Sequence, residues 1–269
     1  MIMTPNLILD QFWRQLAAAQ AAVLMLDYDG TLAPFRVERN QAVPYPGVRE
    51  VLADIRAETA TRLIIISGRA IDDLVPLLAL EPPPEIWGCH GWETLTADGR
   101  RPPVDLPAAA ADGLRAAGAW LEQAGLNRYG EWKPASLAVH WRGLSDHEAN
   151  ELRNRVAAGW QAAAGKAGLV MHPFDGGLEL RCPGRDKGTA VKAILAQSDP
   201  GLPVAFLGDD VTDEDGFAAL EGVGLGVLVR TQRRATRAGL QLMPPDELLA
   251  FLACWRRTAP SNAHLSKGA

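Results

Sequence analysis

Two carboxylates one residue apart are the first side chains in this sequence that could carry chemistry. Asp27 and Asp29, followed by Gly30 and Thr31, come directly after the apolar run 22–26. In the turn that ends a strand they can converge on one point, and glycine supplies the backbone freedom for such a turn. One aspartate can attack phosphorus while the second protonates the leaving oxygen and later activates water. An Asx turn would explain one aspartate and the glycine, but not the whole set.

A second acidic group follows the apolar run 203–207. Residues 209–215 hold five carboxylates within seven positions, and these repel one another unless a cation lies among them. A small number of hard oxygen ligands, completed by a substrate phosphate, is typical of Mg²⁺. The later acids of the group would also stabilise the N-terminus of a following helix. We therefore predict that Asp209 binds the metal and that the later acids are partly structural.

Two further segments offer groups that bind phosphoryl oxygens. Ser67 and Arg69 follow the apolar run 62–66 and supply a hydroxyl and a cation. Lys187 begins a predicted helix, where its charge opposes the helix dipole, and a phosphorylated aspartate would give it a reason to be there. Each signal is weak by itself, because serine and glycine are common at strand ends and lysines are mostly exposed.

The elements that must position these residues alternate between strand and helix. Four short apolar runs are typical of strands buried on both faces: 22–26, 62–66, 203–207 and 224–229. Apolar residues three or four positions apart predict helices over 48–58 and 187–197. This alternation predicts an α/β fold, a Rossmann-like open parallel sheet with helices on both faces. Because ligands bind outside the carboxyl ends of the strands in such sheets, the candidate residues are expected at one edge.

The middle of the chain departs from this alternation. Its pattern predicts two helices, 107–124 and 145–164, and four strands, at about 127–132, 137–141, 169–172 and 178–181. We predict an inserted α+β cap subdomain at 105–180, with a catalytic core built from 1–104 and 181–269. Four tryptophans in the insertion are predicted to pack in its core rather than to stack on a ligand: Trp120, Trp132, Trp141 and Trp160.

Composition excludes several classes of function. The chain has 269 residues, 48% of them hydrophobic, and a formal net charge of −5. A protein that grips a phosphate backbone is normally basic, so no nucleic-acid partner is expected. The longest apolar stretch near the start is far too short to cross a bilayer, so no membrane partner is expected either. Three scattered cysteines favour a reducing compartment, and we expect a cytoplasmic protein, monomeric in solution.

Taken together, these groups resemble the haloacid-dehalogenase-like phosphatases. Their four motifs match Asp27-x-Asp29-Gly30-Thr31, Ser67, Lys187 and Gly208-Asp209-Asp210-x-x-Asp213, in that order. Within that superfamily the chain is similar to the trehalose-6-phosphate phosphatases over nearly its whole length. The residues that carry this narrower resemblance lie in the insertion and just before Lys187: Glu131, Lys133, His140, Arg142 and Glu179.

The resemblance implies roles for the core residues. Asp27 would be the nucleophile and a Mg²⁺ ligand, and Asp29 would be the general acid and base and bind the metal through its backbone carbonyl. Asp209 would complete the protein ligands. The remaining core residues would assist: Thr31 orients the nucleophile, Ser67 and Lys187 hold the phosphoryl oxygens, and Asp210 and Asp213 lie behind the metal or on its bound water.

The resemblance also implies a sugar phosphate as substrate and trehalose biosynthesis as the setting. Lys133 and Glu179 would bind the sugar hydroxyls. Residues expected to line or support the closed site are Arg69, His90, Glu131, His140 and Arg142. Closure of a cap excludes stray water from the reaction.

Two positions depart from the family pattern. Cys89 replaces a residue that is commonly polar or acidic, and Gly176-Gly177 precedes the Glu179 segment where a lysine is frequent. The alternatives are therefore a phosphatase for another glycosyl phosphate, of the sucrose-phosphate or glycosyl-phosphoglycerate type, a phosphomutase, or a non-catalytic module that binds a sugar phosphate. The filled catalytic positions disfavour the non-catalytic module.

Overall fold

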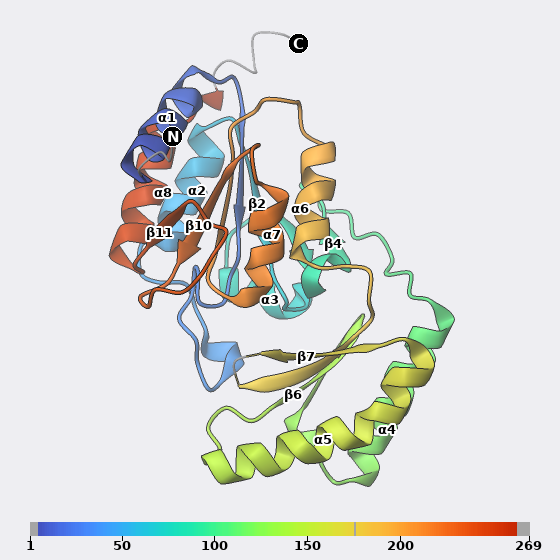
Figure 1. Ribbon diagram of the computed structural model, residues 1–269. Coiled ribbons are helices and arrows are strands. Elements are labelled where there is room, and N and C mark those ends of the chain that lie inside the picture. The colour runs from blue at the N-terminus through green and yellow to red at the C-terminus, as the bar shows by residue number, and fades with distance from the viewer. Residues whose placement is uncertain (1–4, 175, 263–269) are drawn as a thin grey trace. The chain divides into compact units, whose positions relative to one another are not determined.

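The computed structural model of the chain describes residues 5–174 and 176–262. Its contacts divide the chain into two compact units, one formed by Met1–Arg101 with Asp186–Ala269 and the other by Pro102–Arg185. We call the first the parallel-sheet unit and the second the antiparallel-sheet unit, after the sheets that each contains (Figure 1).

The parallel-sheet unit is built on a sheet of seven strands among the described residues, in the order β11-β10-β9-β1-β2-β3-β4. Every neighbouring pair is parallel except β3 and β4. The strands are β1 (Ala22–Leu26), β2 (Thr61–Ile66), β3 (Glu85–Gly88), β4 (Glu93–Leu95), β9 (Val204–Gly208), β10 (Leu225–Val229) and β11 (Leu240–Leu242). The four predicted strands and the predicted α/β class are confirmed.

Helices cover both faces of this sheet (Figure 1). On one face lie α1 (Pro5–Ala18), α2 (Val48–Glu58), α3 (Ile71–Leu78) and α8 (Asp246–Thr258), and on the other α6 (Lys187–Ala196) and α7 (Glu214–Ala219). In β1, Leu24 and Leu26 pack into the first layer, and Val23 and Met25 into the second. This alternation is why the strand reads as a continuous apolar run.

The order of the strands places a topological switch beside β1. From β1 the chain builds β2 and β3 on one side, and β9 and β10 extend the sheet on the other. Such a switch leaves a crevice at the carboxyl ends of the two strands that flank it. The described residues of this unit also form three short 3-10 turns: η1 (Arg39–Gln41), η2 (Cys89–Gly91), which follows β3, and η4 (Val211–Asp213), which follows β9.

The antiparallel-sheet unit has four strands in the described part of the chain, in the order β5-β6-β8-β7. They are β5 (Gly130–Lys133), β6 (Ser136–His140), β7 (Val170–Phe174) and β8 (Gly177–Arg181), accompanied by α4 (Ala108–Gln123), α5 (Asp146–Ala167) and the 3-10 turn η3 (Asn127–Tyr129). The elements predicted for this region are all present, with bounds shifted by a few residues.

The tryptophans of this unit only partly follow the prediction. Trp160 is fully buried, and its indole N–H donates to Ala117 O at 3.3 Å. Trp132 is 56% exposed, so its predicted place in the core is wrong. The reason is that β5 is an edge strand of its sheet, and the Trp132 ring rests there on Gly118 of α4. Trp120 and Trp141 are half-buried.

No helix in residues 5–174 and 176–262 combines the length and the apolar character that a membrane crossing would need.

Candidate active site

The turn after β1 presents Asp27 at the switch point. The Asp27 N–H donates to Leu207 O of β9 at 2.8 Å, which ties the turn to the neighbouring strand. The carboxylate accepts a 3.2 Å hydrogen bond on Oδ2 from Thr31 Oγ1, and the residue is only 3% exposed. Thr31 therefore holds one oxygen of the Asp27 carboxylate.

Lys187 begins α6 and reaches into the same place. Its ammonium donates to Asp27 Oδ1 and to Asp213 Oδ1, both at 2.6 Å, and the side chain is 4% exposed. Asp186 caps the helix by accepting from the N–H of Thr189, so α6 begins at the lysine. Burial alone lowers the pKa of Lys187, but Asp213 and Asp27 together raise it above its ordinary value. The lysine is thus a permanent cation against both acids.

Asp213 organises the loop after β9. Its Oδ2 accepts from the N–H groups of Asp209 and Asp210 at 3.0 and 2.9 Å, and the residue is fully buried. Gly208 makes this possible, because a Cβ there would lie 2.3 Å from the Asp213 carboxyl carbon. Asp213 therefore holds the backbone that carries Asp209.

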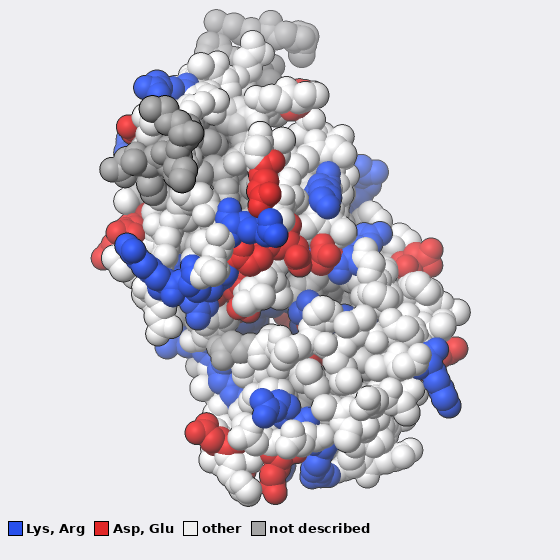
Figure 2. All heavy atoms as spheres, viewed as in Figure 1, with Lys and Arg blue, Asp and Glu red and all other residues white. Residues whose placement is uncertain are grey.

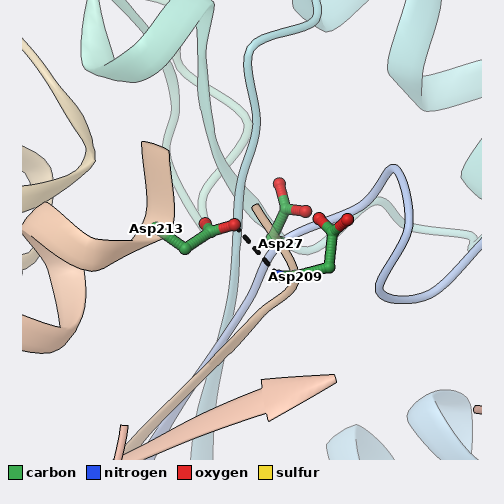
Figure 3. A group of neighbouring side chains, drawn as sticks. All are labelled: Asp27, Asp209 and Asp213. Carbon is green, nitrogen blue, oxygen red and sulfur yellow. Dashed lines mark hydrogen bonds between the residues drawn. The ribbon is translucent and has the colours of Figure 1, made fainter. Parts of the chain in front are cut away.

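The structure brings three carboxylates together: Asp27, Asp209 and Asp213 offer one oxygen each, all within 4.8 Å of one another. In Figure 3 the carboxylates of Asp27 and Asp209 lie side by side, and Asp213 bonds to the backbone of Asp209. Burial raises the pKa of Asp27 to about 7. Burial, followed by the negative charge of Asp27, also raises the pKa of Asp209 well above its ordinary value. A compact set of buried carboxylate oxygens that repel one another fits a hard divalent cation such as Mg²⁺.

This repulsion predicts an unusual pH dependence of stability in the absence of metal. The pKa of Asp27 is about 7 in the folded chain against an ordinary 3.8, so folding takes up a proton and is favoured at low pH. That contribution is lost as the pH rises towards 7 and is of the order of 4 kcal/mol. We expect the melting temperature in chelator to fall by several degrees between pH 5 and pH 8.

Mg²⁺ should raise the melting temperature most at pH 8, where the acids are ionised. The control is Asp27→Asn, which removes one of the acids and should flatten the pH dependence. A melting temperature in chelator that rises between pH 5 and pH 8 would contradict the raised pKa of Asp27.

Gly30 lets the two acidic turns approach each other. Its φ is +81°, and a Cβ there would lie 2.1 Å from Asp209 Oδ2. Gly99 has the same φ of +81° with nothing within 4 Å, so it is a matched control. We expect Gly99→Ala to cost only about 1–2 kcal/mol of backbone strain. Gly30→Ala should add displacement of Asp209 and weaken Mg²⁺ binding by about 10–100-fold, measured as the half-saturating Mg²⁺ concentration. Equal effects of the two substitutions on Mg²⁺ binding would show that the contact does not matter.

The carboxyl end of β2 supplies Ser67 and Arg69. Ser67 Oγ accepts from the Arg69 N–H at 3.1 Å. The Arg69 guanidinium donates to both oxygens of Asp29, at 2.6 and 2.7 Å. Arg69 is expected from the sequence to line or support the closed site, and the structure pairs it with Asp29, the predicted general acid. His90 follows β3, and its ring covers Gly68, where a Cβ would lie 2.7 Å away. The predicted residues of the parallel-sheet unit therefore share one sheet edge.

The predicted residues of the insertion form a separate cluster on one face of the antiparallel sheet. Lys133 donates to Glu179 Oε1 at 2.9 Å and lies 3.7 Å from Glu131 Oε2. His140 Nε2 lies 2.7 Å from the same Glu131 oxygen. In register, Ala138 lies between Glu131 and Glu179, and its small side chain leaves room for the longer ones. Their shared face follows from strand alternation, which turns Trp132 to the opposite face.

Arg142, just beyond β6, lies beside Gly176, where a Cβ would be 3.1 Å from its Nε. Two members of the cluster were not predicted. Ser136 donates to Glu179 Oε1 at 2.7 Å and Arg181 to Glu179 Oε2 at 2.6 Å. Arg181 is two residues from Glu179 on the same strand, so strand alternation would have identified it.

Arg234 is a further residue that sequence reasoning missed. It lies in the loop between β10 and β11, donates to Asp210 O at 2.9 Å and pairs with Glu214. Acidic and basic side chains lie next to one another over α7 on this face (Figure 2). No periodic signal marks Arg234, because an irregular loop carries none. Its hydrogen bond to the Asp210 carbonyl holds the backbone of the acidic loop.

The sequence of the chain matches a known protein family. The sequence model of the trehalose-phosphatase family matches residues 25–243. The trehalose-phosphate phosphatase of Mycobacterium tuberculosis is 33% identical over 266 residues, which cover 92% of this chain and 65% of that protein. That of Mycobacterium marinum is 32% identical over 243 residues, covering 85% of this chain and 60% of that protein.

An uncharacterised glycosyl hydrolase of Mycobacterium tuberculosis is also 32% identical, over 257 residues that cover 89% of this chain and 18% of its own length. The chain thus spans less than two thirds of each of these relatives. Among solved structures, the C-terminal domain of Candida albicans trehalose-6-phosphate phosphatase has a TM-score of 0.76 at 19% identity, covering 96% of this chain and 99% of that chain. This likeness concerns the fold.

The family match spans most of the chain and includes both acidic turns and the antiparallel sheet. The chain therefore belongs to the trehalose-phosphatase family.

Proposed function

We propose that this chain is a Mg²⁺-dependent phosphatase that hydrolyses trehalose 6-phosphate to trehalose and phosphate through a phosphorylated Asp27. The observation that carries the proposal is the buried group at the switch point, in which Lys187 bridges Asp27 and Asp213 beside Asp209. A phosphoryl group could approach so many acids only with cations among them. The similarity to the trehalose-phosphate phosphatases of Mycobacterium tuberculosis and Mycobacterium marinum supports the choice of substrate.

In the first step, Asp27 Oδ attacks phosphorus. The bond to the sugar oxygen breaks, its electron pair stays on that oxygen, and a proton from Asp29 neutralises it. In the second step Asp29 takes a proton from water as the water oxygen bonds to phosphorus. The acyl-phosphate bond then breaks, releasing phosphate and regenerating the Asp27 carboxylate. Ser67 and Lys187 hold the phosphoryl oxygens throughout.

Asp27, Asp209 and the backbone carbonyl of Asp29 are the proposed metal ligands, with Asp213 and Asp210 supporting the loop that carries Asp209. Bound Mg²⁺ would neutralise charge on the phosphoryl oxygens. Thr31 holds the second oxygen of the nucleophile, at 3.2 Å. Each of these contributions orients a group in advance of the reaction.

Cys89, one of the two departures from the family pattern, has a partner inside the folded chain. Cys89 is buried, and its thiol donates to Glu93 Oε2 at 3.2 Å. The side chain is therefore engaged inside the parallel-sheet unit. This departure by itself gives no reason to prefer another glycosyl phosphate.

The test is phosphate release by purified protein from a panel of sugar phosphates, each with Mg²⁺ and with a chelator. We expect Mg²⁺-dependent release from trehalose 6-phosphate well above that from sucrose 6-phosphate and glucosyl phosphoglycerate. Release from one of those two instead would keep the chemistry and change the substrate. Turnover without free phosphate would indicate a phosphomutase, and no turnover would favour the binding module.

Lys133 tests the proposed sugar-binding role of the antiparallel-sheet unit. Lys133→Met should reduce kcat/KM for trehalose 6-phosphate by about 10²-fold, because a charged hydrogen bond to a substrate hydroxyl is lost. An aryl phosphate, which has no such hydroxyl, should be hydrolysed nearly as fast as by the unchanged protein. Equal losses on both substrates would exclude Lys133 from sugar recognition.

A further inference from the structure

We propose that Arg69 is a positioning residue: it holds the carboxyl group of Asp29 in the orientation from which Asp29, in its protonated form, gives a proton to the sugar oxygen. The proposal rests on the function proposed above, in which Asp29 is the general acid. Arg69 is expected from the sequence to line or support the closed site, and the proposal gives it a supporting role that acts through another side chain.

The ion pair between the two residues has the geometry that fixes both partners. Arg69 Nε lies 2.6 Å from Asp29 Oδ2, and Nη2 lies 2.7 Å from Oδ1. Two parallel hydrogen bonds between planar groups set the plane of the carboxylate as well as its distance. A lysine, as a point charge, could not do this.

Arg69 is itself held from three sides. Its backbone N–H donates to Ser67 Oγ, and its carbonyl accepts from the N–H of Cys89 at 2.8 Å. Its guanidinium carbon lies 5.7 Å from the centroid of the Tyr28 ring. That ring is fully buried, and its hydroxyl donates to Ala42 O at 2.7 Å, so it cannot shift aside easily. Arg69 is thus fixed by the turns after β2 and β3, and it fixes the position of Asp29 in turn.

Binding of the phosphoryl group by Arg69 fits these contacts less well. To reach a ligand with the same two donors, the guanidinium would have to leave Asp29, whose side chain is 28% exposed. That would leave a partly buried carboxylate without its charge partner, at a cost in free energy. In the proposed mechanism Ser67 and Lys187 hold the phosphoryl oxygens, so Arg69 is not needed for that role.

The leaving group separates the two roles. A sugar alkoxide leaves only with a proton, whereas a nitrophenolate leaves as a stable anion and needs no general acid. The ratio kcat/KM reports the steps up to release of the leaving group and is not affected by later hydrolysis of the phosphoenzyme. An arginine that acts through the general acid should therefore matter for the sugar phosphate and little for the aryl phosphate.

The experiment compares Arg69→Ala with the unchanged protein on trehalose 6-phosphate and 4-nitrophenyl phosphate, both with Mg²⁺. We expect kcat/KM to fall by about 10²-fold for the sugar phosphate and by no more than about 10-fold for the aryl phosphate. Added guanidinium ion, at concentrations that leave the melting temperature unchanged, should restore part of the loss, and methylammonium should not. Equal losses on the two substrates, or no loss, would overturn the proposal.

Arg62→Ala is the matched control. Arg62 pairs in the same two-bond fashion with Glu85, at 2.9 and 2.8 Å, and lies at the other end of β2 from Arg69. It should lower stability without changing the ratio of the two activities. A ratio that changes equally in both variants would mean that general loosening, and not positioning, is responsible.

A second measurement tests the pair without turnover. The melting temperatures of Arg69→Ala, Asp29→Asn and the double variant form a cycle, and we expect the double variant to melt no lower than the less stable single variant. Shifts that simply add would overturn the proposal. If the unchanged protein released no phosphate from any sugar phosphate, the proposed function would be wrong. The melting temperatures of the three variants would then still show whether Arg69 and Asp29 stabilise each other.

Discussion

Asp27→Asn is expected to abolish phosphate release, with a loss in kcat on the order of 10⁴-fold or more, because an amide oxygen is a far poorer nucleophile than a carboxylate. The fold should persist, since the amide has the same shape and removes one charge from a buried group whose members repel one another. The measurement is phosphate release from trehalose 6-phosphate with saturating Mg²⁺, alongside a melting curve.

Asp10→Asn provides the control for this substitution, because Asp10 lies on α1 and is exposed. It should keep full activity. If Asp27→Asn turned over at the rate of the unchanged protein, the phosphorylated aspartate would be wrong and another group would have to be the nucleophile.

Lys187→Met is expected to have the largest effect on stability. The ammonium is buried between Asp27 and Asp213, at 2.6 Å from each. Removing one partner from such a buried set leaves uncompensated charge, which typically costs about 3–5 kcal/mol. Chemical denaturation with chelator present measures the free energy of unfolding. The loss should be smaller at pH 5 than at pH 8, because protonation of Asp27 relieves the repulsion, and Mg²⁺ should recover part of it.

Lys192→Met is the matched control, since Lys192 lies on the same helix and is exposed. It should change the free energy of unfolding by no more than about 0.5 kcal/mol. A loss as small in Lys187→Met would mean that the two acids do not depend on the lysine for their burial.

The parallel-sheet unit was largely predictable because its strands are buried on both faces. A strand such as β1, packed by Leu24 on one side and Val23 on the other, must be apolar throughout, and that run stops where the sheet edge begins. The short strands β3, β4 and β11 were not predicted. Segments of three or four residues are too short for a period to emerge.

The burial of single side chains was less predictable. Trp132 was predicted in the core and is exposed, because strand alternation identifies a face but not whether that strand lies at the edge of its sheet. The pairing of Arg69 with Asp29 and the contact of Arg234 with the acidic loop depend on residues 40 and 24 positions away. No local pattern encodes such contacts.

Local patterns were enough to identify the groups that could do chemistry: two aspartates after one strand, an acidic run after another, and a lysine at the start of a helix. Each of these patterns depends on a few residues at a strand end or a helix start. The contacts between the groups depend on the folded chain. The fold placed Lys187 between Asp27 and Asp213 and turned Arg69 to Asp29, because parallel strands distant in sequence end at one sheet edge.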